Sequence, residues 1–193
     1  MRWLLSIVAF TTMAATEPLA VPFFRQQKNG CGAASVAMVI HYWKPGAPPA
    51  TEVYRQLYIP ERKGIPLADM RRYLEDAGFR AFTLRGQWSD AETHIGKGRP
   101  IIVSLKARRS GRMHFAVLSG LDGGYVWVND PTRKQAHRVK LAEFQKQWEL
   151  ADRWMLLASP PLTSPPLTSP AAGTADSSAA SPDSPGHSRS IAP

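Results

Sequence analysis

Apolar positions in the first half of the chain recur at helical spacing. Residues 31–43 are apolar on most sides, which is the pattern of a buried helix. Two later segments carry a narrower apolar stripe, and Gly78 follows the second of them as a stop signal. A polar Ser89-Asp90 pair is suited to cap one more helix. The predicted helices span residues 31–43, 51–57, 66–77 and 89–96.

Short runs of β-branched and aromatic residues dominate the second half. Strands are predicted at residues 79–84, 100–105, 114–119, 125–129 and 154–157, with one more helix at 141–150. Most helices come first and most strands follow, which predicts an α+β fold with an antiparallel sheet.

The strands at 114–119 and 125–129 flank an Asp-Gly-Gly sequence, which is typical of a hairpin turn. A turn centred near Asp122 and Gly123 places His114 opposite Asp130 or Pro131. Directly opposed residues on one face of a hairpin come within about 5 Å at Cβ. The remainder of that face is expected to consist of Ala116, Leu118, Val126 and Val128.

Both ends of the chain differ from the middle in composition. Residues 1–20 combine a positive start, a short apolar run and small residues, which predicts a secretory signal cleaved after Ala14, Ala15 or Ala20. The mature protein is therefore expected to be exported, periplasmic or secreted, without a transmembrane segment. Residues 159–193 are rich in Pro, Ser, Thr and Ala, which predicts a disordered tail. One domain is expected between them, at residues 21–158.

The charge of the chain is strongly positive. The net charge is +9, and because the two ends together contribute −1, the middle carries +10. Such a field favours anionic partners, among them the surface of the cell envelope. No zinc-finger spacing, helix-turn-helix pattern or aromatic ribonucleoprotein motif accompanies the charge, so nucleic acid is not an expected partner.

Cys31 is the only cysteine, which excludes an internal disulfide and a multi-cysteine metal site. No metal or cofactor is predicted. The residue lies between Gly30 and Gly32 where the first helix begins, and helix N-termini lower the pKa of a thiol. We interpret the two glycines as leaving the sulfur open to approach. The alternative is that Cys31 is a small buried residue, the commonest fate of cysteine.

A nucleophilic thiol needs a base, and the chain offers five histidines. His41 lies on the same helix, about 15 Å from Cys31. His114 is the better candidate because Asp130 is expected beside it, in the orienting position of a triad. The alternative is that Asp130-Pro131 simply ends a strand. Gln26 and Gln27 precede the cysteine closely enough to donate to an oxyanion, although loop glutamines without a role fit equally well.

Several motifs together resemble one family. The segment PFFRQQKNGCGAASVAMVIHYW resembles the N-terminal signature of the bacteriocin-processing, double-glycine-type cysteine peptidases of the papain-like superfamily. The resemblance continues through GIPLADMRRYLEDAGF, GRPIIVSL, MHFAVLSG, YVWVNDP, LAEFQKQW and WMLLA, and it covers about residues 21–158.

The resemblance implies a papain-like fold in which the helix of Cys31 packs on the sheet. It implies that Cys31 is the nucleophile, His114 the general base and acid, Asp130 the orienting carboxylate and Gln26 the oxyanion donor, with Gln27 a lesser candidate. The implied activity is hydrolysis of a peptide bond in a peptide or protein. The chain has no transmembrane bundle and no GxxxxGK[ST] loop, which indicates a free-standing, exported relative. An acyl transferase on the same triad, or a peptide-binding module without catalysis, are the alternatives.

Overall fold

The computed structural model describes residues 17–106, 111–133 and 136–161. The predicted tail from residue 162 on, and residues 1–16 of the predicted signal, lie outside the described residues. Within the described part, no helix is both long and apolar enough to span a membrane. The helical elements are α1 (Cys31–Trp43), α2 (Ala50–Leu57), η1 (Pro60–Arg62), α3 (Leu67–Asp76), α4 (Trp88–Gly96) and α5 (Leu141–Glu149). The strands are β1 (Arg80–Arg85), β2 (Ile101–Lys106), β3 (Met113–Asp122), β4 (Tyr125–Asn129), β5 (His137–Lys140) and β6 (Trp154–Ser159).

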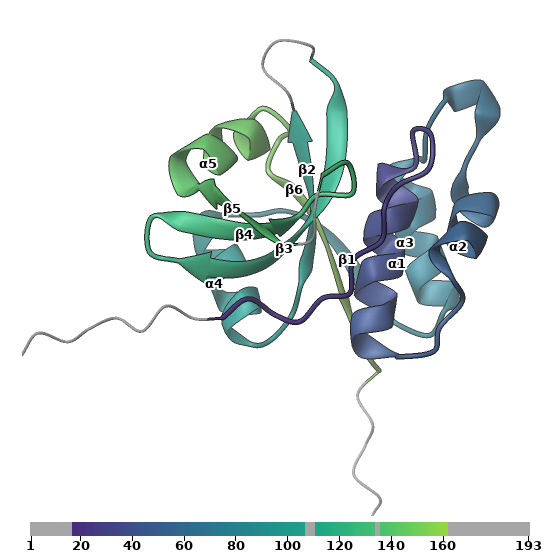
Figure 1. The fold of residues 1–193 in the computed structure, drawn as a ribbon, viewed down its shortest axis with the longest axis horizontal. Coiled ribbons are helices and arrows are strands. Elements are labelled where there is room, and N and C mark those ends of the chain that lie inside the picture. Colours follow the sequence, from purple (N-terminus) through teal and green to yellow (C-terminus); the bar gives the residue numbers. More distant parts are fainter. Residues whose placement is uncertain (1–16, 107–110, 134–135, 162–193) are drawn as a thin grey trace, which may run out of the picture. The chain divides into compact units, whose positions relative to one another are not determined.

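The six strands form one sheet in the order β1-β6-β2-β3-β4-β5, and every neighbouring pair is antiparallel. Helices α1, α2 and α3 cover one face, and α4 and α5 lie on the other (Figure 1). Because both faces are covered, β2 is buried at all of its first five positions. The predicted combination of helices with an antiparallel sheet is confirmed.

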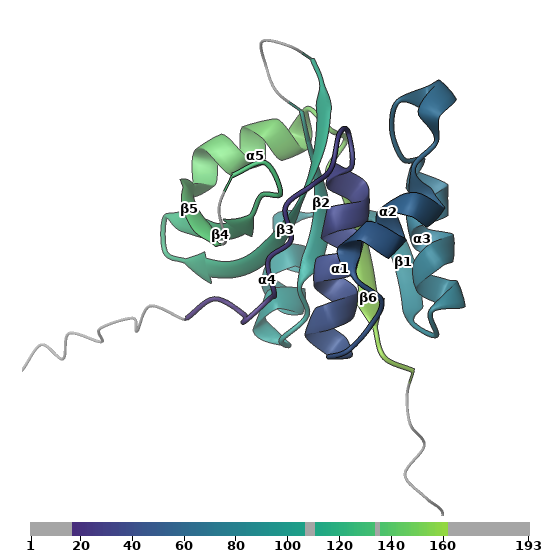
Figure 2. The ribbon, with the colours of Figure 1, turned by 45° about the vertical axis from the view of Figure 1, so that its right-hand side comes forward.

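Helix α1 has the predicted bounds and the predicted burial. Every residue from Gly32 to Ile40 is buried, because the helix is enclosed between β3 on one side and α2 and α3 on the other (Figure 2). A helix that is apolar all round loses most of its stability when it leaves such an environment, since each large apolar side chain contributes about 1.5–3 kcal/mol on burial. Its N-terminus is therefore held at a fixed position relative to the sheet.

Apart from shifts of up to three residues at the ends of other elements, three elements differ from the sequence prediction: η1 and β5, which were not predicted, and α4, whose cap differs. Strand β5 was not predicted, because its four residues alternate in burial and follow a polar loop that carries no strand signal. Helix α4 begins one residue earlier than predicted and is capped by Gln87, not by Ser89 and Asp90. Asp90 instead accepts the Gln87 backbone N–H at 2.7 Å, which completes a capping box.

The register of the β3–β4 hairpin also differs from the prediction. The predicted register puts Leu118 opposite Val126 or Trp127, whereas Leu118 pairs with Val128. The turn centres on Gly123 and Gly124, and a bulge between Leu118 and Gly120 shifts the pairing once more. The ladder ends at Val117 and Asn129, so His114 has no ladder partner on β4. The predicted core face of Ala116, Leu118, Val126 and Val128 is present, packed under α5.

Candidate active site

Cys31 is the first residue of α1 and follows a tight turn. The Gly30 N–H donates to the Gln27 carbonyl at 3.0 Å, and Asn29 takes the left-handed conformation with φ +54°, which asparagine tolerates. The backbone N–H groups of Phe115 and Gly32 donate to the Cys31 sulfur. The Phe115 amide is open to the sulfur because the β3–β4 ladder ends two residues further along β3. The tip of α1 and the start of β3 therefore meet at the thiol.

The His114 side chain lies between Cys31 and Asp130. Its Nε2 is 2.7 Å from Oδ1 of Asp130, and the ring is also hydrogen-bonded to the Cys31 side chain. Because Nε2 faces the carboxylate, Nδ1 is the ring nitrogen left for the sulfur. The structure thus joins Cys31, His114 and Asp130 in one hydrogen-bonded chain, although Asp130 reaches His114 from beyond the end of the ladder.

Thr132 fixes the carboxylate of Asp130. Its backbone N–H and its hydroxyl donate to Oδ1 of Asp130 at 2.9 and 2.7 Å. Sequence reasoning missed this residue, although Asp followed two positions later by Thr is the pattern of an Asx-turn. Arg133 adds a looser ion pair at 3.6 Å to the other carboxylate oxygen.

The hydrogen bonds shift the pKa values of all three groups. Burial raises the pKa of the Cys31 thiol, but the hydrogen bonds from His114, Phe115 and Gly32 outweigh it and bring the pKa below 9.0. Burial lowers the pKa of His114, but its hydrogen bonds to Asp130 and Cys31 raise it from 6.5 to about 9. Burial raises the pKa of Asp130, yet the donors from His114 and Thr132 hold it well below its usual value. The directions of the Cys31 and His114 shifts both favour transfer of the thiol proton to the imidazole, which gives a thiolate beside an imidazolium.

The same shift links His114 to stability. Because the folded pKa of about 9 exceeds the unfolded value of 6.5, the protonated imidazole stabilises the fold fully below pH 6.5. That contribution disappears as the pH rises through about 9.

Gln26 and Gln27 differ in their surroundings. The Gln26 backbone N–H donates to the Pro131 carbonyl at 3.2 Å, which holds Gln26 beside the corner that carries Asp130. Its side-chain oxygen is buried and has no hydrogen-bond partner in the part of the chain that the structure describes. Gln27 is exposed.

The two glycines beside Cys31 serve packing, and their role in leaving the sulfur open to approach stays a prediction. A Cβ on Gly30 would lie 2.6 Å from Cδ2 of Tyr54. A Cβ on Gly32 would lie 3.0 Å from the sulfur of Met70. The glycines thus let α2 and α3 pack closely against the tip of α1, a contact between distant segments that the sequence pattern does not reveal.

Substitution of Gly30 by alanine is expected to destabilise the protein by about 1–3 kcal/mol. The Tyr54 ring has little room to yield, because it stacks on Tyr58 at 4.8 Å and its hydroxyl donates to the Lys28 carbonyl at 2.9 Å. Thermal unfolding followed by circular dichroism measures the effect. Gly96→Ala is the matched control, because nothing lies within 4 Å of its added Cβ. Equal unfolding midpoints for the two variants would contradict the packing role.

Among the described histidines, only His114 interacts with Cys31. Nε2 of His41 is 3.0 Å from the Pro48 carbonyl, and its ring contacts Phe24. His94 lies on α4, across the sheet from α1. His137 begins β5 opposite Val128, and burial lowers the pKa of this imidazole although Asp130 is near enough to raise it.

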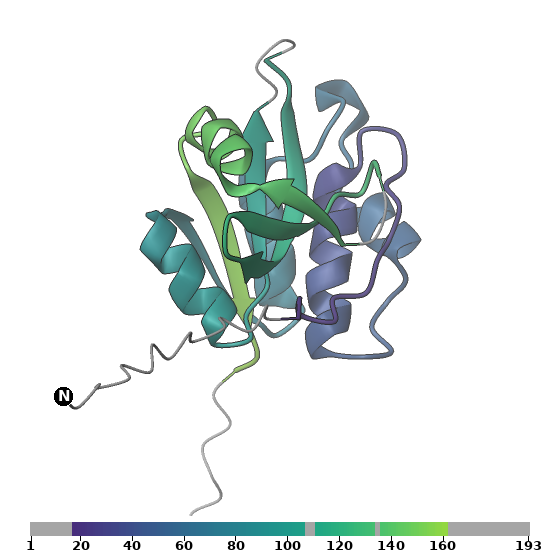
Figure 3. The same ribbon diagram turned by 60° about the vertical axis from the view of Figure 1, so that its left-hand side comes forward.

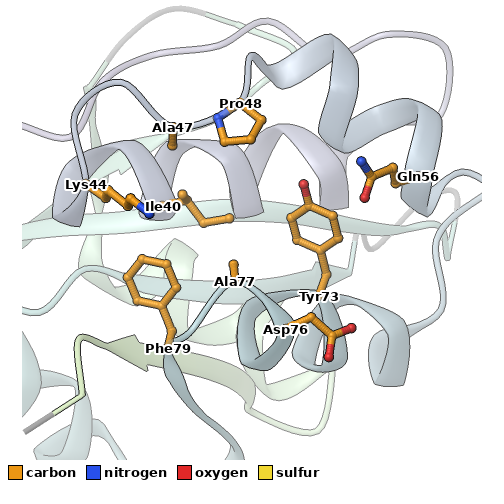
Figure 4. A pocket seen from close by; sticks show the side chains of 9 residues that line it. All are labelled: Ile40, Lys44, Ala47, Pro48, Gln56, Tyr73, Asp76, Ala77 and Phe79. Carbon is orange, nitrogen blue, oxygen red and sulfur yellow. The ribbon is translucent and has the colours of Figure 1, made fainter.

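A cavity of about 450 Å³ lies on the helical side of the molecule (Figure 4). Ile40 and Lys44 from the end of α1, Tyr73 from α3, and Phe79 after α3 are among the side chains that line it. None of Cys31, His114, Asp130 and Gln26 takes part in its lining. A molecule bound in this cavity would therefore not contact the three hydrogen-bonded side chains.

Curated relatives share part of the chain. The protein is 35% identical over 125 residues to the probable functional amyloid protease FapD of Pseudomonas aeruginosa, which covers 61% of this chain and 52% of that protein. It is 29% identical over 107 residues to the protein of the same name from Pseudomonas fluorescens, which covers 52% of this chain and 45% of that protein. The chain thus spans about half the length of the curated relatives it matches.

Solved structures share the fold, and a family model covers most of the chain. A double glycine motif protease from an AMS/PCAT transporter, in complex with the leader peptide, has a TM-score of 0.58 at 25% identity over 75% of this chain and 94% of that one. A putative C39-like peptidase from Bacillus anthracis has a TM-score of 0.60 at 15% identity, covering 75% and 98%. The expected papain-like arrangement is thereby confirmed. The model of the Peptidase_C39 like family matches residues 18–154, so the chain belongs to this family of cysteine-type peptidases.

Proposed function

We propose that the protein hydrolyses peptide bonds with Cys31 as nucleophile, His114 as general acid and base, and Asp130 as the carboxylate that orients the imidazole. The observation that carries the proposal is the chain of hydrogen bonds from the Cys31 sulfur through His114 to Asp130. A module that only bound peptides would gain nothing from a thiol with a lowered pKa beside a protonated imidazole.

The proposed reaction has two steps. The Cys31 thiolate attacks the substrate carbonyl, a C–S bond forms, and the Gln26 amide and the Cys31 N–H stabilise the oxyanion. The His114 imidazolium gives its proton to the leaving amine as the C–N bond breaks, which leaves a thioester. Water then attacks the thioester, His114 takes the proton of that water, and the C–S bond breaks to release the carboxylate product. Asp130 stabilises the imidazolium and fixes its orientation throughout.

The proposed substrate is an exported polypeptide. The resemblance of residues 1–20 to a secretory signal supports export of the mature enzyme, and the positive domain suits an anionic envelope surface. Because the curated relatives carry the name probable functional amyloid protease, polypeptides that assemble into fibres are the first candidates. A leader peptide of the kind bound by the transporter protease is the second.

Labelling and product analysis together test the proposal. Iodoacetamide or E-64 is expected to modify Cys31 rapidly at neutral pH, and a sulfur that reacts only above about pH 8 would instead favour a binding module. A substrate peptide cleaved in the presence of an added amine is expected to yield the free carboxylate. A new amide in its place would indicate the acyl transferase.

Gln26→Ala is expected to lower kcat by about 10²–10³-fold with little change in KM, because an oxyanion donor acts only in the transition state. Steady-state hydrolysis of a peptide substrate measures both constants. Gln27→Ala is the matched control, since this neighbouring side chain is exposed. If the Gln27 variant lost kcat and the Gln26 variant did not, the assignment of the donor would have to be exchanged.

A further inference from the structure

The described N-terminal segment is bound to the bulge in β3. The Leu19 N–H donates to the Ser119 carbonyl at 2.7 Å, and the Val21 N–H donates to the Leu19 carbonyl at 2.7 Å. Ser119 lies where the β3–β4 register shifts between Leu118 and Gly120, so it has no ladder partner on β4. In a regular ladder the Ser119 carbonyl would have paired with a neighbouring strand, but at the bulge it is left to accept a hydrogen bond from the N-terminal segment.

Side-chain packing fits the same segment to the bulge. A Cβ on Gly120 would lie 3.0 Å from Cα of Pro18 and 3.1 Å from the Trp127 ring, so glycine leaves the room that Pro18 occupies. Leu19 packs against the core cluster around α1, and Val21 is only 2% exposed. Pro18 and Leu19 thus belong to the folded domain, and the family match also begins at residue 18.

Residues 18–21 are the anchor of the N-terminal segment, and from them the chain leads directly to the active site. The Asn129 side-chain amide donates to the Val21 carbonyl at 3.0 Å, and the Gln26 N–H donates to the Pro131 carbonyl. Figures 2 and 3 show the segment, in purple, running past β3 to the tip of α1. Residues 18–26 therefore connect the bulge to the turn before Cys31, with Gln26 at the far end.

The anchor discriminates among the cleavage positions that the sequence leaves open. Cleavage after Ala20 would remove Pro18 and Leu19 and would turn the Val21 nitrogen into a charged ammonium. That nitrogen now donates to the lost Leu19 carbonyl in a buried position, where an unpaired charge is costly. Cleavage after Ala14 or Ala15 leaves every one of these contacts intact.

We propose that processing cleaves this chain after Ala14 or Ala15, so that the mature enzyme retains residues 18–21 as the anchor of the segment that carries Gln26. The inference rests on the proposed export of the protein. Its consequence is that the signal ends before the folded domain begins. The bulge at Ser119 then binds the N-terminal segment of the mature enzyme through Leu19.

The full chain, produced in a bacterium with its own N-terminus and recovered from the periplasm or medium, tests this directly. Intact mass and N-terminal sequencing are expected to give a first residue of Ala15 or Thr16. An exported protein that begins at Val21 overturns the inference but leaves export standing. A protein that keeps Met1 and stays in the cytoplasm contradicts export, and the inference falls with it.

A truncated chain tests the anchor itself. A protein that begins at Val21 is expected to lose at least about tenfold in kcat relative to one that begins at Thr16, part of the effect of removing Gln26. Its rate of alkylation at Cys31 is expected to stay the same, because the bonds among Cys31, His114 and Asp130 involve no residue before Val21. An unchanged kcat and unfolding midpoint would overturn the anchoring role. Gly120→Ala in the longer chain is expected to lower kcat in the same direction, because its added Cβ would lie 3.0 Å from Cα of Pro18. Gly124→Ala is its matched control, since that added Cβ meets nothing within 4 Å.

Discussion

Replacement of Cys31 by alanine is expected to abolish peptide-bond hydrolysis, with a loss in kcat of about 10⁴-fold or more. The variant retains Gln26, His114 and Asp130, so it can still bind substrate, but no group remains that forms the thioester. The measurement is proteome-wide cleavage profiling, in which new peptide N-termini produced by the wild type are compared with those produced by the variant. The profile also identifies the substrate class and the residues around the cleaved bond.

The stability of the Cys31→Ala variant is expected to fall only by the part of the His114 stabilisation that the thiol supplies, because Cys31 is half-buried at the first position of α1. Ser35→Ala is the matched control one turn further along the helix. Its buried hydroxyl has no hydrogen-bond partner among the described residues, so its loss removes nothing that the fold uses. If the Cys31→Ala variant produced the same set of new peptide N-termini as the wild type, Cys31 would not be the nucleophile.

The positions of helices and strands were predictable where the spacing of apolar residues matched either a helix or a strand clearly. The bounds of α1 and β4 agree with the prediction, because glycine and proline flank an apolar helix in one case and a hairpin turn precedes a β-rich run in the other. The neighbours of each strand were not predictable. Strand β6 is last in the chain yet pairs with both β1 and β2, and no local pattern encodes that choice. The bulge had one signal in the sequence, Gly120, which lies just after the predicted strand at 114–119 and within β3 as it is observed.

The approach of His114 to Asp130 was predicted from a register that proved wrong. The pairing at Leu118 is displaced by two residues from the alternative that puts His114 opposite Asp130, and by one residue from the alternative that puts it opposite Pro131. Because the ladder ends at Asn129, Asp130 reaches His114 from the corner after β4 and not through the strand register. Thr132 and the backbone amide of Phe115 donate hydrogen bonds to Asp130 and Cys31 from a loop and from the end of a strand ladder. The spacing of apolar residues along the sequence does not reveal such contacts.

Substitution of His114 by alanine is expected to remove the second largest share of activity, about 10²–10⁴-fold in kcat, because general acid–base catalysis is lost while the thiol remains. The reactivity of the thiol itself distinguishes this role from a structural one. In the wild type the neighbouring imidazolium lowers the pKa of the thiol, so alkylation at pH 6 is expected to be faster than for an ordinary thiol. In the variant the thiol loses that neighbour, and its pKa is expected to rise toward the ordinary value of about 8.5.

The pH dependence of alkylation by iodoacetamide gives the decisive measurement. An ordinary thiol is ionised to less than about 1% at pH 6, but a thiolate of low pKa is also less nucleophilic, so the net loss at pH 6 is expected to be on the order of tenfold. For wild-type hydrolysis, activity is expected to fall as the pH rises through about 9, where the imidazolium that protonates the leaving amine loses its proton. His94→Ala is the matched control, because this half-buried imidazole lies across the sheet from α1. If the His114 and His94 variants had the same alkylation profile as the wild type, the thiolate would owe its stability to the helix N-terminus and the Phe115 amide alone, and His114 would not be the base.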